Sequence, residues 1–215
     1  MIIAIDGPAG SGKTTTARKV SQRLGYIHIN TGAMYRGITL KFMREKVNLE
    51  DNRAIRKILQ NTNLDFEGPL CAIIHLDGHD ISTTITSNIV TENVSRISAI
   101  SQVREKLVEY QRKIAQGKNV VLEGRDIGTV VFPNADFKFY LIADIKIRAE
   151  RRRKELEATG EYMSIEEIIL FLKDRDQKDS SRENSPLIKA KDAIELDTTA
   201  LSIKEQVNFI INIVT

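Results

Sequence analysis

Eight consecutive residues near the start of the chain have the types and spacing that hold phosphate. They match the pattern G-x-x-x-x-G-K-[ST] in full, as Gly7-Pro8-Ala9-Gly10-Ser11-Gly12-Lys13-Thr14. An apolar strand is expected just before them, over 2–5, and a helix just after them, over 13–24. The glycines let backbone N–H groups wrap a phosphate, and the helix N-terminus adds a favourable partial charge. Lys13 is then expected to reach the β- and γ-phosphates of a nucleotide, and the Thr14 hydroxyl to ligate Mg²⁺.

This loop alone does not select a reaction, because GTPases, ATPases and small-molecule kinases all use it. Asp65-Phe66-Glu67-Gly68 has the form of the D-x-x-G switch of a GTPase. The guanine-reading element [NT]-K-x-D, however, is absent from the sequence. We interpret 65–68 as a polar turn before a hairpin, and the GTPase hypothesis is disfavoured.

Arginines offer the second anion site that a kinase needs for its acceptor. Arg125 follows a buried strand, and ligands of open α/β sheets bind at the carboxyl ends of strands. Arg175, Asp179 and Arg182 are four and three residues apart, so they can share one helical face. Arg36 and Arg104 could instead be ordinary helix residues whose side chains point into solvent. The start of another helix holds Arg148, Arg151, Arg152 and Arg153, and at most two of the last three can face one ligand.

The elements that must position these residues alternate between apolar strands and helical patterns. This rhythm predicts an α/β fold with three layers, in which helices flank a five-stranded parallel sheet. Strands are expected at 2–5, 26–29, 120–123, 137–143 and 193–196. Helices are expected at 13–24, 31–46 (capped by Thr31), 91–116, 146–158 and 164–176, with a final helix capped by Ser202 and Glu205.

A small antiparallel insertion interrupts this rhythm near 64–85. Cys71–Leu76 and His79–Thr83 flank Asp77-Gly78, a hairpin signal. The nearby His75, His79 and Asp80 resemble metal ligands, but alternate strand residues face opposite sides, so we interpret them as a solvated turn.

Composition limits the remaining classes. The chain has 215 residues, 41% of them hydrophobic, which suits one globular domain. No apolar run is long enough for a membrane span, no basic leader precedes the first strand, and the lone Cys71 excludes an internal disulfide, so a cytoplasmic protein is expected. A net charge of only +3, no Trp and 6% aromatic residues argue against a nucleic-acid-binding module.

Four segments together resemble the bacterial cytidylate kinases: GPAGSGKTT, TGAMYR, EGRDIGTVVFP and the stretch from Asp174 to Arg182. The resemblance runs from Ile2 to the final helix. It implies a P-loop kinase that uses ATP and Mg²⁺ to convert CMP and dCMP into the diphosphates. A related kinase with another acceptor, such as UMP or AMP, is the alternative. The implied partners are small nucleotides, with no nucleic acid and no membrane, and we expect a monomer.

The resemblance also implies regions and roles. The core would be 1–30, 117–147 and 177–215, the monophosphate-binding region 31–116, and the lid 148–176. The ATP-binding loop would run from Gly7 through Thr15, with Arg148 beside it. Thr14 and Glu123 would hold Mg²⁺. For the acceptor, the resemblance implies that the cytosine contacts Ser95, Arg104 and Asp126 and that the ribose contacts Arg175 and Asp179. The acceptor phosphate would contact Arg36, Arg125 and Arg182, in a pocket lined by Thr31 and Tyr35. Catalytic roles fall to Lys13, Arg125, Arg152 and Arg182.

Overall fold

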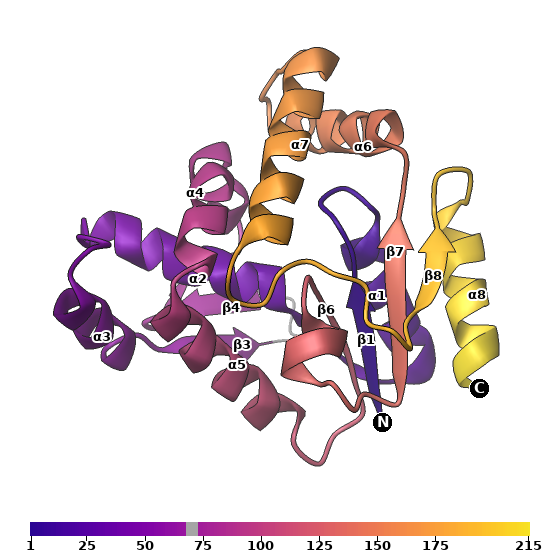
Figure 1. The fold of residues 1–215 in the computed structure, drawn as a ribbon, viewed down its shortest axis with the longest axis horizontal. Coiled ribbons are helices and arrows are strands. Elements are labelled where there is room, and N and C mark those ends of the chain that lie inside the picture. The colour runs from indigo at the N-terminus through magenta and orange to yellow at the C-terminus, as the bar shows by residue number, and fades with distance from the viewer. Residues whose placement is uncertain (68–72) are drawn as a thin grey trace.

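A computed structural model describes residues 1–67 and 73–215 of the chain. Its main sheet has five parallel strands in the order β2-β6-β1-β7-β8 (Figure 1). The strands are β1 (Ile2–Asp6), β2 (Ile27–Asn30), β6 (Val120–Gly124), β7 (Phe137–Ile142) and β8 (Ile194–Asp197). The predicted five-stranded parallel sheet is therefore confirmed, with strand bounds within two residues of those expected.

Helices cover both faces of this sheet, because successive strand residues point to opposite sides. Ile3 and Ile5 pack with helices α1 (Lys13–Leu24) and α8 (Ile203–Val214). Ala4 belongs to a larger cluster on the other face, with side chains from α2 (Thr31–Arg44), α4 (Asn88–Ser98) and α5 (Ser101–Ala115). The arrangement is the three-layer α/β fold that the alternation of elements predicts.

Two peripheral parts extend this core. Helices α6 (Ile145–Glu157) and α7 (Ile165–Ser181) share their own apolar cluster and lie beyond the carboxyl end of β7 (Figure 1). On the side of α2 lie α3 (Asn52–Gln60) and an antiparallel sheet of β3 (Leu64–Glu67), β4 (Ile73–Leu76) and β5 (His79–Asp80). The hairpin expected at Asp77-Gly78 is confirmed by the pairing of β4 with β5. Cys71, at the start of the expected strand, lies outside the described residues.

The single helix expected over 91–116 is wrong, because the structure has two helices there. Ile100 is extended (φ −71°, ψ 122°) and separates α4 from α5. The carbonyl of Ser98, freed by the break, accepts a hydrogen bond from Arg104 Nη1 at 3.1 Å. The apolar spacing continues across the break, which is why the sequence looks like one helix.

Three smaller expectations also need correction. The segment beginning at Asp65 is not a polar turn, since Leu64–Glu67 pairs with β4 as strand β3. Helix α3 was not expected at all. Thr31 does not cap α2: the Asn30 side chain accepts from the N–H of Ala33, while the Thr31 hydroxyl donates to the carbonyl of Glu123 at 2.7 Å. The capping boxes of α7 and α8 are confirmed. Across 1–67 and 73–215, no helix combines the length and apolarity needed to cross a bilayer.

Candidate active site

The loop between β1 and α1 is shaped by glycine and held from outside. Gly7 has φ +147°, and a Cβ there would lie 2.1 Å from the carbonyl oxygen of Leu141. The carbonyls of Ala9 and Gly10 accept hydrogen bonds from Arg148 and Arg151. In the described part of the chain, the backbone N–H groups of Gly10, Gly12, Lys13 and Thr14 have no acceptor. The loop therefore presents a row of free donors, as an anion site requires.

Lys13 lies folded over this loop. Its Nζ donates to the carbonyl of Pro8 at 2.5 Å and lies 3.2 Å from the Ser11 hydroxyl. Burial, followed by the positive charge of Arg125, holds the pKa of Lys13 well below its usual value. An anion in the loop would oppose both effects, so the charge of Lys13 and the binding of phosphate favour each other.

A hydroxyl and a carboxylate meet beside the loop. Thr14 Oγ1 donates to Glu123 Oε2 at 2.7 Å, and His28 Nε2 lies 3.3 Å from Glu123 Oε1. Burial alone would raise the pKa of Glu123, but the close approach of His28 and the hydrogen bond from Thr14 outweigh it and lower the pKa. The carboxylate is therefore charged. Together with phosphate oxygens and water, this donor set fits Mg²⁺, which seldom binds in an all-protein cage.

A larger metal-binding cluster is absent from the part of the chain that the structure describes. Within the described residues, no three His, Cys, Asp or Glu side chains are placed to hold a metal ion. His75 lies 3.8 Å from Glu67, and His79 Nδ1 lies 3.1 Å from the Asp77 carbonyl, at the exposed hairpin.

Several arginines surround one buried carboxylate, Asp179. Arg125 Nε donates to Asp179 Oδ2 at 2.9 Å, and Arg182 Nη1 lies 3.9 Å from Oδ1. Burial alone would raise the pKa of Asp179, but the charges of Arg125, Arg175 and Arg182 outweigh it and lower the pKa. Burial, then the charge of Arg125, lowers the pKa of Arg175 to about 9. More positive than negative side chains therefore surround Asp179, and this excess of positive charge would stabilise an anion bound beside them.

These guanidinium groups also retain unused donors. Arg36 Nε, Arg175 Nε and Arg182 Nη2 are buried and have no hydrogen-bond partner among the described residues. The charges of Glu123 and Arg125 both act on Arg36, so Arg36 lies near the loop and near the arginines around Asp179. Buried donors of this kind are costly unless a ligand satisfies them, and phosphate oxygens are suitable acceptors.

A second charged pair lies next to this cluster. Arg104 and Asp126 form an ion pair through Arg104 Nη2 and Asp126 Oδ2, and both side chains are buried. Arg104 Nε has no partner, and the described residues offer none to Asp126 Oδ1. The guanidinium carbon lies 5.2 Å from the centre of the Tyr35 ring. The charges of Arg104 and Asp126 act on both Tyr35 and Arg182, so this pair lies next to the arginines around Asp179.

The other residues singled out from the sequence lie around these two sites. Ser95 is half-buried on α4, and Thr15 lies in the first turn of α1. Arg148 is tied to Asp176 at 2.6 Å as well as to the loop, and Arg151 donates to Thr198. Arg152 reaches α4 through Asn88, while Arg153 is exposed and pairs with Glu157. Arg148 and Arg151 thus brace the loop, while Arg152 lies close enough for its charge to act on Arg36 and Arg175.

Sequence reasoning missed residues whose partners are distant in the chain. Asp6 accepts the N–H groups of Ile127 and Gly128 at 2.9 and 2.7 Å, which fixes the turn after Asp126. Burial raises the pKa of Asp6 to about 6 despite these bonds. A carboxylate ending a buried strand just before the loop is a usable signal for Asp6. His28 and Asn88 carry no such signal.

Comparison with known proteins identifies relatives of this chain. A family model described as cytidylate kinase matches residues 3–215. The cytidylate kinase of Fusobacterium nucleatum is 48% identical over 210 residues, covering 98% of this chain and 95% of the relative. That of Caldanaerobacter subterraneus is 49% identical over 205 residues, covering 95% and 90%.

Solved structures show a similar fold. A shikimate kinase from Bacteroides thetaiotaomicron has a TM-score of 0.50 at 12% identity, covering 100% of this chain and 98% of that chain. An uncharacterized protein from Eubacterium ventriosum has a TM-score of 0.52 at 12% identity, with the same coverage. At such low identity these two show the fold alone. The family match over nearly the whole chain, and relatives close to half identical, show more: this chain belongs to the cytidylate kinase family.

Proposed function

We propose that this chain phosphorylates CMP and dCMP, using ATP as the donor, to form CDP and dCDP. Membership of the cytidylate kinase family supports the activity. The observation that carries the choice of acceptor is the buried Arg104–Asp126 pair, which lies beside the arginine cluster and keeps a free donor and a free acceptor. The phosphate loop supplies the site for ATP.

The free edge of that pair suits cytosine. Cytosine presents an exocyclic amine that donates and ring atoms that accept. Asp126 Oδ1 would accept from the amine, Arg104 Nε would donate to the ring, and Ser95 on the neighbouring helix would complete the contact. The ribose would then lie toward Arg175 and Asp179, and the phosphate toward Arg36, Arg125 and Arg182, in a pocket lined by Thr31 and Tyr35.

The reaction needs charge screening rather than a catalytic base. The second pKa of a phosphate monoester is about 6, so the acceptor is largely dianionic at neutral pH and is already a nucleophile. Its approach to the triphosphate is opposed by repulsion between two anions. Lys13 and the arginine cluster, with Arg152 beside it, would offset that repulsion and stabilise the charge spread over the transferring group.

Two further features complete the proposal. Thr14 and Glu123 would hold Mg²⁺, partly through water, and the ion supplies charge neutralisation on the triphosphate. Residues 148–176 would act as the lid, which must exclude water because water would otherwise accept the phosphoryl group. We also expect the enzyme to act as a monomer.

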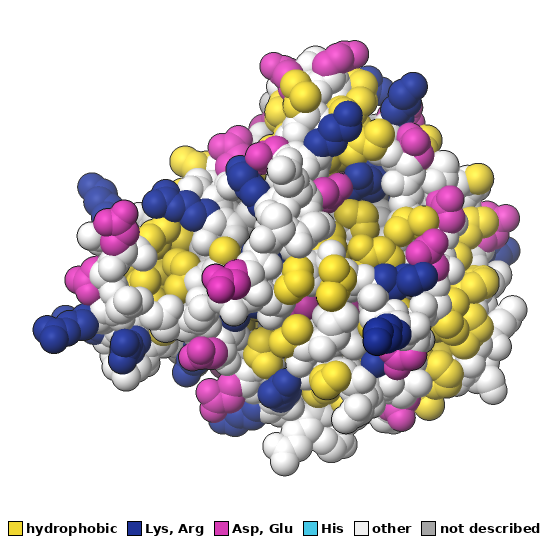
Figure 2. Space-filling model, viewed as in Figure 1, with side chains coloured by type: hydrophobic (Ala, Val, Ile, Leu, Met, Phe, Trp, Pro, Cys, Tyr) yellow, Lys and Arg dark blue, Asp and Glu magenta, His cyan; other side chains and the backbone are white. Residues whose placement is uncertain are grey.

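Two alternatives have less support. UMP would place an acceptor where cytosine has its amine, opposite a carboxylate, so it should be a poorer substrate. A nucleic-acid partner would favour a continuous basic surface. On the face drawn in Figure 2, lysine and arginine side chains are interspersed with acidic ones instead.

A steady-state assay of the acceptor panel tests the proposal. ADP release would be coupled to a spectrophotometric readout, with ATP, Mg²⁺ and CMP, dCMP, UMP, AMP or GMP as acceptor. We expect kcat/KM to be highest for CMP and dCMP and at least about tenfold lower for UMP. A higher value for AMP or GMP would overturn the assignment of the Arg104–Asp126 pair.

A further inference from the structure

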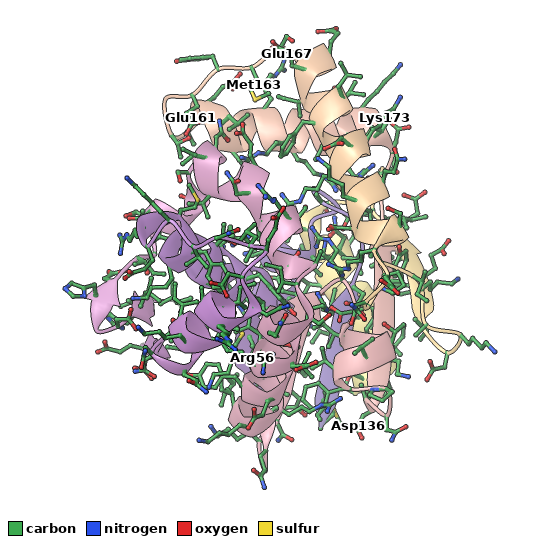
Figure 3. All side chains as sticks on the ribbon, turned by 60° about the vertical axis from the view of Figure 1, so that its left-hand side comes forward. Arg56, Asp136, Glu161, Met163, Glu167 and Lys173 are labelled. Carbon is green, nitrogen blue, oxygen red and sulfur yellow. The ribbon has the colours of Figure 1, made fainter. Side chains whose placement is uncertain are left out.

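One side chain connects α4 with the part of the molecule formed by α6, α7 and the loop between them. Asn88 is the first residue of α4. Its Oδ1 accepts from Arg152 Nη2 of α6 at 2.9 Å, and its Nδ2 donates to Glu161 in the loop between α6 and α7. Figure 3 shows Glu161 in that loop, close to the end of α4. The two bonds span 64 and 73 positions of sequence.

The arginine held in this way reaches the anion site. The charge of Arg152 lowers the pKa of both Arg36 and Arg175, so its guanidinium lies near the acceptor-phosphate arginines. Its other side-chain partner, Glu155, lies on its own helix at 3.2 Å. Among the residues that the structure describes, Asn88 is therefore the side chain that ties Arg152 to α4.

Both bonds together require a side-chain amide. The carbonyl oxygen of an amide accepts while its nitrogen donates, so Asn88 can serve a cation and an anion at once. Aspartate would keep the bond to Arg152 but face Glu161 with a second negative charge. Alanine would lose both bonds.

We propose that Asn88 is a positioning residue that latches the lid onto the monophosphate-binding region and aims Arg152 at the transferring phosphate. The catalytic part of this inference rests on the proposed kinase function. The latch itself is a contact within the protein, and it can be measured without any substrate.

Tyr162 provides that measurement. It lies next to Glu161 and is 82% exposed, in a loop that chymotrypsin can enter. The rate of cleavage after Tyr162, followed by mass spectrometry without nucleotide, reports how often the loop leaves α4. We would compare the wild type with N88A, N88D, E161Q and the double variant N88D/E161Q, which exchanges the amide and the carboxylate. The matched control is N93A, because Asn93 lies on the same helix and its side chain, within residues 1–67 and 73–215, bonds only to Ile89 of that helix.

The expected pattern is specific to the latch. Cleavage should accelerate about fivefold in N88A and N88D, because both variants lose the bond from position 88 to Glu161 that holds the loop, and one hydrogen bond of ordinary net strength is worth about that change. It should stay within about twofold of the wild type in N93A, and in E161Q, whose amide oxygen can still accept from Asn88. The double variant should return to within about twofold, because its carboxylate on α4 would accept both from Arg152 and from the amide placed in the loop. In N88A, kcat with CMP should fall about fivefold while KM for CMP stays within about twofold.

Two results would overturn the proposal. One is cleavage of N88A no faster than that of N93A. The other is a double variant no slower to be cleaved than N88D, which tests the latch even if N88A itself folds poorly. Failure of the kinase function would appear differently, as a wild type that forms no CDP while the cleavage pattern holds.

Discussion

Replacing Asp126 by asparagine should change which base the enzyme prefers. The substitution keeps the shape of the side chain and one oxygen for Arg104, but replaces the acceptor facing cytosine by an amide that can donate. The side chains of Asp126 and Arg104 are each 5% exposed, so little water can reach the pair to replace the lost contact. CMP should lose a hydrogen bond, whereas UMP should gain a donor opposite its carbonyl.

The structure sets the size of this effect. A hydrogen bond to a charged group is worth about 1.5–3 kcal/mol, so the ratio of kcat/KM for CMP to that for UMP should fall about 10- to 100-fold. The substitution also weakens a buried ion pair. Because one oxygen remains for Arg104, we expect a loss of about 2–3 kcal/mol in the free energy of unfolding, somewhat less than for a broken pair. For a chain of this size that lowers Tm by about 4–12 °C.

The assay is designed to separate these two effects. Both acceptors would be measured on one preparation at saturating ATP, well below Tm, so any inactive fraction cancels from the ratio. Asp192→Asn is the matched control, since Asp192 also pairs with a buried cation, Lys138 at 2.7 Å, at a residue we have not placed in the site. The control should leave the ratio unchanged. Equal losses on CMP and UMP in Asp126→Asn would refute base reading at this position.

Three further predictions concern the loop, the clamp and pH. Lys13→Ala should lower kcat about 100-fold or more with little change in the circular dichroism spectrum, and near-normal turnover would contradict the role of Lys13. Arg125→Ala should lower kcat/KM for CMP about 10- to 100-fold through both constants, whereas a change confined to KM for ATP would show that Arg125 is misplaced here. Asp6 has a pKa of about 6 in the folded state against an ordinary 3.8, so the folded state binds its proton more tightly than the unfolded state does. Protonation of Asp6 therefore stabilises the fold fully below about pH 4, and this stabilisation is lost as the pH rises to about 6. Urea unfolding should therefore show a fall of about 3 kcal/mol across that window that is missing in Asp6→Asn, and parallel curves would count against the raised pKa.

The parts of the fold that could be predicted are those written in local sequence. The phosphate loop, the buried strands and the capping boxes at Ser164 and Ser202 all depend on neighbours a few residues away. The break between α4 and α5 could not be predicted in this way. The apolar spacing continues through Ile97, Ile100 and Val103, and the bond from Arg104 to the Ser98 carbonyl becomes visible only in three dimensions.

The same distinction applies to the site. Asp179 and Arg182 are close in sequence, so their grouping could be predicted from helical spacing. The partners of Arg104 and Arg152 could not, because Asp126 lies 22 residues from Arg104 and Asn88 lies 64 from Arg152. Resemblance to a family suggested a role for Arg104 and Asp126, but it did not indicate that they form a buried pair.

The central claim is that the γ-phosphoryl group of ATP passes to the phosphate of CMP. Phosphorus NMR of the wild type with equimolar ATP, CMP and Mg²⁺ tests it most directly, because the β-phosphorus of CDP and inorganic phosphate give separate signals. We predict that CDP and ADP appear in a one-to-one ratio, with almost no inorganic phosphate. Loss of ATP to inorganic phosphate without formation of CDP would contradict the account.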